Sequence, residues 1–343
     1  MNKQREKWID YIKLLACVLV AMGHFFMGLV EANILSESQV HNWFIRTIYY
    51  FHVPLFFLCS GYLYQKKSKV NSLLSWWNNV RKKAICLGIP YFVFSIATWL
   101  LKNVFSGAVN TQNDGLLESL FLNPASPYWY LYTLFFIFLI TPTFAGRKSA
   151  LAGLTFALVL NCIQAIPVFN INIYAFTQTC AKLIWFVLGM CLCVFDIPAF
   201  FRKKLWKRIS IPCAVLFFGV SLLNFGSWTY SVAVTLLMGM LGCMSVFLVM
   251  LNWTGGKKLD IAADVFSKYT MPIYLMHTIF AAGIRAVLLK LGIDTPVVHI
   301  IIGLAVSFIG PVVAAWIMER IKLDILIYPD KYLKRKSQQG AKK

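Results

Sequence analysis

Lys13 and His24 are ionisable residues inside one long apolar segment near the start of the chain. They are eleven residues apart, so on an α-helix they share one face, about 16 Å apart along the axis. A lysine attracts anionic groups, and an imidazole can take a proton from a hydroxyl near neutral pH. Asp10 lies close to the same stripe. The pattern predicts an anion site leading to a general base, or else an Asp10–Lys13 pair with a histidine bonded to a neighbouring helix.

His52 and Ser60 occupy a second apolar segment. Pro54 follows His52 and kinks a helix, because proline removes a backbone hydrogen bond. Gly61 follows Ser60 and allows another helix to approach closely. His52 and Ser60 are therefore candidates for substrate contact, with helix packing as the alternative interpretation.

A later apolar segment carries Tyr274, His277 and Arg285. His277 and Arg285 lie about 80° apart around a helix and so flank one sector. A buried arginine needs an anionic partner or a polar cavity, and the alternatives are an ion pair to another helix or extension to the membrane surface. Trp129 opens a further apolar segment, either as a substrate contact or within an aromatic belt. Lys102 and Lys290 lie near segment ends, from which they are expected to reach the membrane surface.

The composition shows what kind of protein must position these side chains. Of 343 residues 59% are hydrophobic and only 13% are charged, with a mean hydropathy of +0.68. Soluble domains carry roughly 25% charged residues, so this chain is predicted to be an integral membrane protein. Disordered, collagen-like, disulfide-rich and nucleic-acid-binding classes are excluded. The nine cysteines are interpreted as small buried apolar residues, and no metal site is expected.

Ten apolar runs are long enough to predict an all-α protein with about ten transmembrane helices. They form one membrane-embedded domain over residues 1–330, followed by a basic, disordered cytoplasmic tail at 331–343. The runs lie at about 9–30, 44–64, 84–105, 128–144, 149–167, 176–195, 209–226, 228–251, 267–289 and 297–318.

The basic residues give the orientation. If the first residue is cytoplasmic and the runs alternate, 27 of the 33 Lys and Arg residues fall on the cytoplasmic side. This bias is typical of multi-pass membrane proteins and predicts that both termini are cytoplasmic. The chain is expected in a cell membrane, such as the bacterial inner membrane. The net charge of +20 is then explained by topology and by contact with anionic lipids of the bilayer, without a nucleic-acid partner.

Four stretches of the chain together resemble the acyltransferase-3 family of integral membrane acyltransferases. The likeness extends from about residue 8 to residue 311, in the order and on the segments that the family has. It is carried by Lys13 with His24, by residues 51–63 ending in Ser60-Gly61-Tyr62, by the basic stretch 81–83 before Pro90-Tyr91, and by Tyr274-Leu275-Met276-His277. The family commonly has His-Leu where this chain has Pro127-Tyr128, and commonly arginine where it has Lys13.

The resemblance implies an acyl-CoA donor, usually acetyl-CoA, drawn from the cytoplasm, and an acceptor hydroxyl on a sugar or cell-envelope glycan. Arg81, Lys82 and Lys83 would attract the phosphates of the donor at the cytoplasmic mouth, and His24 would act as the base. The acceptor is expected between the runs at 9–30, 44–64 and 267–289. The sequence does not indicate an oligomeric state.

Two other function classes stay open at this point. Lys13, His24, His277 and Arg285 could line the path of a glycan or lipid transporter or flippase. The chain could also be a noncatalytic partner of a polysaccharide synthase.

The charge pattern generates one direct test of topology. A green fluorescent protein fused after Lys343 should fluoresce, and alkaline phosphatase at the same place should be inactive, because the C-terminus is predicted to be cytoplasmic. An active phosphatase fusion would contradict the ten-span orientation.

Overall fold

The computed structural model describes residues 6–105, 115–164, 173–223, 232–253 and 256–333, together with residues 166, 171 and 225. Throughout these residues the regular structure is helical and contains no strand, which confirms the all-α prediction. The helices are α1 (Lys7–Glu31), α2 (Gln39–Lys67), α3 (Leu73–Val104), α4 (Trp129–Ile140), α5 (Arg147–Gln164), α6 (Tyr174–Val194), α7 (Ile197–Phe201), α8 (Lys204–Leu223), α9 (Val232–Asn252), α10 (Lys257–Ser267), α11 (Thr270–Lys290) and α12 (Pro296–Arg320).

Seven of these helices are long and apolar enough to cross a membrane, so the protein is a multi-pass membrane protein. They are α1, α3, α6, α8 from Trp206 onward, α9, α11 and α12. The other three predicted runs coincide with α2, α4 and α5. Helix α4 ends at Ile140, short of the predicted run, because Pro142 cannot continue a helix. The number of ten crossings stays a prediction.

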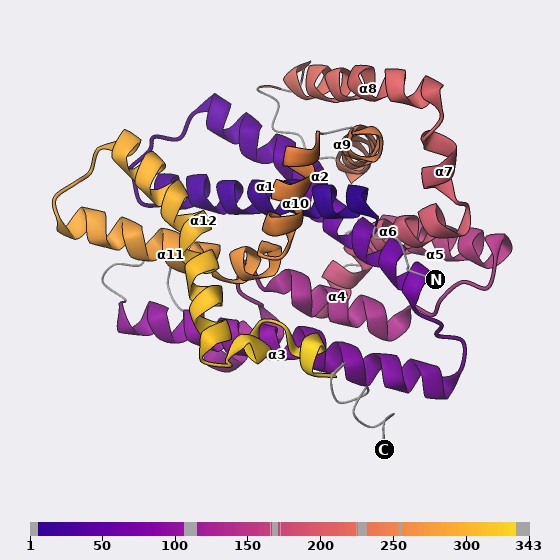
Figure 1. Cartoon of the computed structure of the whole chain (residues 1–343), viewed down its shortest axis with the longest axis horizontal. Helices are drawn as coiled ribbons and strands as arrows, with labels where there is room; N and C mark the ends of the chain where they lie inside the picture. Colours follow the sequence, from indigo (N-terminus) through magenta and orange to yellow (C-terminus); the bar gives the residue numbers. More distant parts are fainter. Residues whose placement is uncertain are drawn as a thin grey trace.

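Helix α1 lies along the middle of the assembly (Figure 1) and contacts α2, α9, α10, α11 and α12. On one side of it, α2, α6 and α9 enclose the largest apolar core, together with α4 and α5. On the other side, a second core joins α3, α4, α11 and α12. The central position of α1 brings its polar stripe between the two cores.

The closest helix contact is the crossing of α2 and α6. A Cβ atom at Gly61 would overlap the carbonyl oxygen of Phe186, and one at Gly189 would overlap the carbonyl oxygen of Leu58. Two glycines therefore let the backbones touch, which confirms the close approach predicted for Gly61.

The N-terminus of α1 is held by ion pairs at its polar end. Glu6, which precedes α1, pairs with Lys66 of α2 and with Arg202 just after α7. Burial raises the pKa of Glu6, but the Lys66 ammonium and the Arg202 guanidinium outweigh it and hold the pKa below its usual range. Lys7 pairs with Asp260 of α10 at 2.8 Å. These contacts fix α1 against three other elements.

The predicted tail begins in ordered structure. Lys331 lies 3.4 Å from the carboxylate of Asp324, and Tyr332 donates a hydrogen bond to the same carboxylate. Residues 329–333 form a helical turn. The predicted tail from 331 is thus attached through its first three residues, and residues 334–343 lie outside the described part of the chain.

At the crossing of α2 and α6, adding a single methyl group is expected to lower the stability of the protein strongly. Gly61→Ala or Gly189→Ala should destabilise the protein by at least about 1–3 kcal/mol, because the backbones must move apart. Thermal unfolding in detergent, followed by size-exclusion chromatography, measures this. Gly88→Ala is the matched control, since no atom lies within 4 Å of its added Cβ. Equal melting temperatures for Gly61→Ala and Gly88→Ala would contradict the crossing.

Candidate functional site

A cavity of about 720 Å³ opens between the C-terminal halves of α1, α3 and α11. The segment at 115–126, just before α4, closes its fourth side. No residue of α2 lines it, so α3 takes the place that was predicted for the run at 44–64. Helix α2 packs against both α1 and α6, whereas the C-terminal half of α3 faces α1 and α11 across the cavity.

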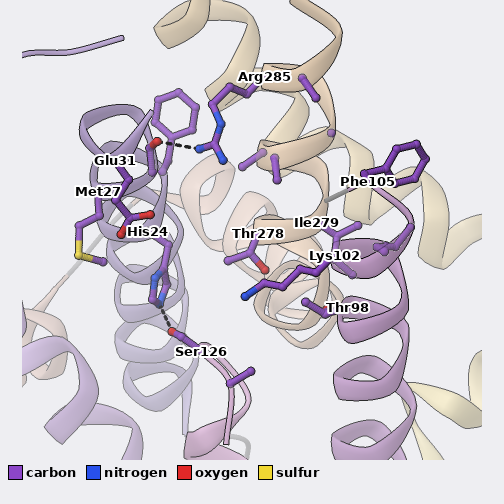
Figure 2. Close-up of a pocket in the computed structure, with 18 of the residues that line it drawn as sticks. His24, Met27, Glu31, Thr98, Lys102, Phe105, Ser126, Thr278, Ile279 and Arg285 are labelled. Atoms are coloured by element: carbon purple, nitrogen blue, oxygen red, sulfur yellow. Dashed lines mark hydrogen bonds between the residues drawn. The ribbon is translucent and has the colours of Figure 1, made fainter. Parts of the chain in front are cut away.

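His24, the predicted base, lines this cavity (Figure 2). Its Nε2 atom lies 3.3 Å from the Oγ atom of Ser126, within the range of a hydrogen bond. Ser126 belongs to the segment before α4 and is exposed to the cavity. A hydroxyl group is therefore already placed at the ring nitrogen that would take a proton.

His277 lies beside His24, with 5.4 Å between the ring centroids. Its Nδ1 atom is 2.8 Å from the carbonyl oxygen of Ile273 and 3.0 Å from that of Tyr274. Carbonyl oxygens only accept, so Nδ1 carries the hydrogen and the lone pair of the neutral ring is on Nε2. That Nε2 is buried and has no hydrogen-bond partner among the described residues. The Nε2 atom of His277 is therefore a hydrogen-bond acceptor without a partner among the described residues, in a ring that lies beside that of His24.

His52 is fully buried on α2. As in His277, its Nδ1 atom contacts the carbonyl oxygen of the residue four positions earlier. Its Nδ1 atom lies 2.5 Å from the carbonyl oxygen of Ile48, and its ring packs against Tyr49. His52 interacts electrostatically with His24 and with Lys182. It approaches the site from the α2 side and does not line the cavity, so its role as a substrate contact stays a prediction.

Arg285 ties α11 to α1 at the rim of the cavity. Its Nη1 atom donates to the carbonyl oxygen of Gly28 at 2.8 Å, and its charge interacts with Glu31 (Figure 2). A Cβ atom at residue 28 would lie 2.6 Å from this guanidinium nitrogen, so a larger residue there would displace the end of the Arg285 side chain. Arg285 thus contacts another helix through a backbone carbonyl oxygen and also lines the cavity.

Lys102 and Lys290, which are expected from the sequence to reach the membrane surface, both line the cavity, and Lys290 is exposed. Figure 2 shows Lys102 extending from α3 across the cavity toward Thr278. The sequence gives only the depth of a lysine along its helix. Which side of α3 faces a cavity depends on α1 and α11, which the helix sequence does not reveal.

Tyr274, Ser60 and Trp129 support the segment around Ser126 from outside the cavity. Tyr274 donates to the carbonyl oxygen of Pro127 at 2.5 Å. Tyr128, fully buried, donates to the carbonyl oxygen of Leu275 at 3.0 Å. The two bonds attach this segment to α11. Ser60 lies 3.1 Å from the Tyr130 hydroxyl, and Trp129 packs against Lys182 at 5.9 Å.

Near the N-terminal end of α1, the charge of Lys83 interacts with that of Lys13, and Lys83 also lies 3.6 Å from the centre of the Phe138 ring. Arg81 and Lys82 are exposed, and Lys82 also interacts electrostatically with Lys83. The predicted trio of 81–83 is thus divided by exposure, with Lys83 as its more buried member.

Asp10 and Lys13 both interact electrostatically with Cys59, a buried thiol on α2. Asp10 therefore faces the interior near Lys13, as the shared stripe predicts. Its catalytic role stays a prediction. Within the described residues no three His, Cys, Asp or Glu side chains gather closely enough to bind a metal ion.

Sequence reasoning missed Ser126 and Lys102 as site residues. A usable signal for Ser126 was its place directly before Pro127 and the tyrosines that anchor this segment. The signal for Lys102 is its place in an apolar segment, where a lysine indicates function by default.

The chain is similar to two curated relatives over part of its length. It is 26% identical over 139 residues to the nodulation protein NolL of Mesorhizobium japonicum and 29% identical over 142 residues to that of Sinorhizobium fredii. These regions are 40% and 41% of this chain, but only 36% and 37% of the relatives, so the match spans about a third of their length. No solved structure matches.

A family model described as an acyltransferase domain matches residues 6–316, nearly the whole chain. The match covers every helix that lines the cavity, along with Lys13 and Lys83. The chain therefore belongs to the acyltransferase-3 family, as the motifs on α1, α2, α3 and α11 indicate.

Proposed function

We propose that this protein transfers an acyl group, usually acetyl, from cytoplasmic acyl-CoA to a hydroxyl group of a sugar or cell-envelope glycan. The observation that carries the proposal is the hydroxyl of Ser126 at 3.3 Å from His24 Nε2, inside a cavity that could admit an acceptor. Membership of an acyltransferase family and likeness to proteins named for nodulation support it. No metal takes part in this proposal.

The reaction needs one proton carrier. The acceptor oxygen attacks the thioester carbonyl carbon while its hydrogen moves to Nε2 of His24. The tetrahedral intermediate then collapses, the carbon–sulfur bond breaks, and the CoA thiolate takes the proton back from His24. Atoms and charge balance without an oxidant or a metal.

In this proposal His277 orients His24 and stabilises its protonated form. Its ring lies 5.4 Å from that of His24, Nδ1 is fixed by two carbonyl oxygens, and Nε2 is buried without a hydrogen-bond partner among the described residues. When His24 becomes an imidazolium ion, the Nε2 lone pair of His277 offers it an acceptor in a buried setting where water is scarce. His277 therefore acts through His24.

The donor enters from the other end of α1. Lys13 and Lys83 give a paired positive charge about 16 Å below His24 along the helix. The phosphates of acyl-CoA would bind there, with Arg81 and Lys82 attracting them from solution, and the pantetheine arm would extend toward His24. This arrangement agrees with ten crossings, cytoplasmic termini and residence in a cell membrane.

His24→Ala should lower kcat for acetyl transfer by about 10²–10⁴-fold, because it removes the general base. Lys13→Ala should instead raise the KM for acetyl-CoA, and Lys13→Arg should be tolerated. Transfer of label from [14C]acetyl-CoA to glycan, in membrane vesicles and with purified protein, measures both constants.

Ser126→Ala is the control for this experiment. It should retain transfer within a few-fold, because the hydroxyl of the acceptor takes the place of Ser126 at His24. Turnover of folded His24→Ala near the wild-type rate would contradict the assignment of the base. Movement of unmodified glycan across vesicles without label would favour a transporter or flippase.

Lys83 should contribute more to donor binding than its two neighbours. Lys83→Gln should raise the KM for acetyl-CoA more than the double variant Arg81→Gln/Lys82→Gln does, since Lys83 is more buried than its neighbours and its charge interacts with that of Lys13. Neutralising all three should give the largest increase and leave acceptor affinity unchanged. A larger increase in the KM for acetyl-CoA from Arg81→Gln/Lys82→Gln would contradict this, and would indicate that the phosphates of the donor bind at the exposed residues instead of at Lys83.

A further inference from the structure

The cavity is polar at the end nearest His24. Hydroxyl groups from α3, α11 and the segment before α4 line this end, and they belong to Ser95, Thr98, Thr278 and Ser126. Ser95 is 3% exposed, and its hydroxyl has no hydrogen-bond partner among the described residues. Because buried polar atoms rarely stay unsatisfied, a ligand with hydroxyl groups of its own would complete this wall. A sugar therefore suits this end of the cavity.

Beyond these hydroxyls, α3 and α11 line the cavity with two apolar stripes. On α11, Ile279, Gly283 and Val287 recur every four residues and share one side of the helix over about 12 Å. On α3, Leu101 and Phe105 have the same spacing, and Figure 2 shows Phe105 at the far end of this wall. Leu101, Phe105 and Val287 are 40%, 53% and 52% exposed, so no described residue covers them fully.

The charged groups of the lining lie away from these stripes. Arg285 faces α1, where it donates to the carbonyl oxygen of Gly28 and interacts with Glu31. Lys102 extends from α3 toward the hydroxyl end of the cavity (Figure 2). Lys290 is exposed in the last turn of α11. The stripes on α3 and α11 therefore offer a continuous apolar surface.

The apolar stripes adjoin the hydroxyl end, so a molecule with a polar head and a hydrocarbon chain matches the whole cavity. We infer that the acceptor is a glycolipid, whose sugar binds at His24 and whose hydrocarbon chain lies along the stripes. This inference rests on the proposed acyl transfer and specifies its substrate class. Both α3 and α11 are long and apolar enough to cross a membrane, so the chain of a membrane lipid can reach them. A soluble glycan would leave both stripes in water, at a cost that grows with their apolar area.

The first test asks whether the labelled acceptor carries a hydrocarbon chain. Membranes of the native host, containing either the wild-type protein or His24→Ala, receive a short pulse of [14C]acetyl-CoA. The labelled material is treated with protease and applied to an octyl column, which retains molecules that carry a hydrocarbon chain. We expect the label that depends on His24 to be retained, and mild alkali to release it as acetate, because the product is an ester.

The second test makes the stripes polar at nearly constant volume. The double variant Leu101→Asn/Val287→Thr should raise the KM for the acceptor by roughly tenfold, as expected when about two methylene groups lose their apolar contacts. The KM for acetyl-CoA should stay unchanged. The acceptor in this assay is the retained fraction from the octyl column, after alkali has removed its acetyl esters. Val215→Thr/Leu216→Asn, at exposed positions on α8, is the matched control, and size-exclusion chromatography verifies the folding of both variants.

Two results would overturn the inference while leaving acyl transfer intact. One is label that depends on His24 but appears only in glycan that the octyl column does not retain. The other is an equal acceptor KM in folded Leu101→Asn/Val287→Thr and in the wild type, which would mean that only bilayer lipid contacts the stripes. Absence of such label from every fraction would overturn the proposed transfer and this inference together, so the two failures are distinguishable.

Discussion

A neutral imidazole kept at membrane depth, beside a polar cavity, is the constraint on which the rest of this structure depends. Hydrocarbon offers no hydrogen bonds, so a histidine there must find partners within the protein. His24 satisfies this by lying on the central helix, with Ser126 at 3.3 Å and His277 beside it. A helix at the lipid boundary could not offer both partners, which explains the position of α1.

The two apolar cores on either side of α1 differ in how tightly they pack. The crossing of α2 and α6 brings the backbones into contact at Gly61 and Gly189, and it forms a close-packed support for one side of α1. On the other side, the second core leaves space, and hydrogen bonds from Tyr274 and Tyr128 help to hold the segment with Ser126 against α11. Tight packing on one side thus leaves the cavity on the other.

The sequence predicted the elements well because their signals are local. Apolar length and the stripe of Lys13 and His24 depend on one helix each, and both agree with the structure. The site was harder to predict, because Lys102 and Ser126 become site residues only through the neighbours of α3 and of the segment before α4. The division of Lys83 from Arg81 and Lys82 likewise depends on Phe138, which lies 55 residues further along the chain.

The two substrates of the proposed reaction would use the two ends of α1. Positive charge from Lys13 and Lys83 lies near its N-terminal end, and the cavity lies along its C-terminal half. Entry from opposite ends would let only the reacting groups, a thioester and a hydroxyl, meet at His24. The polar stripe of a single helix would then be sufficient to align the proposed reaction.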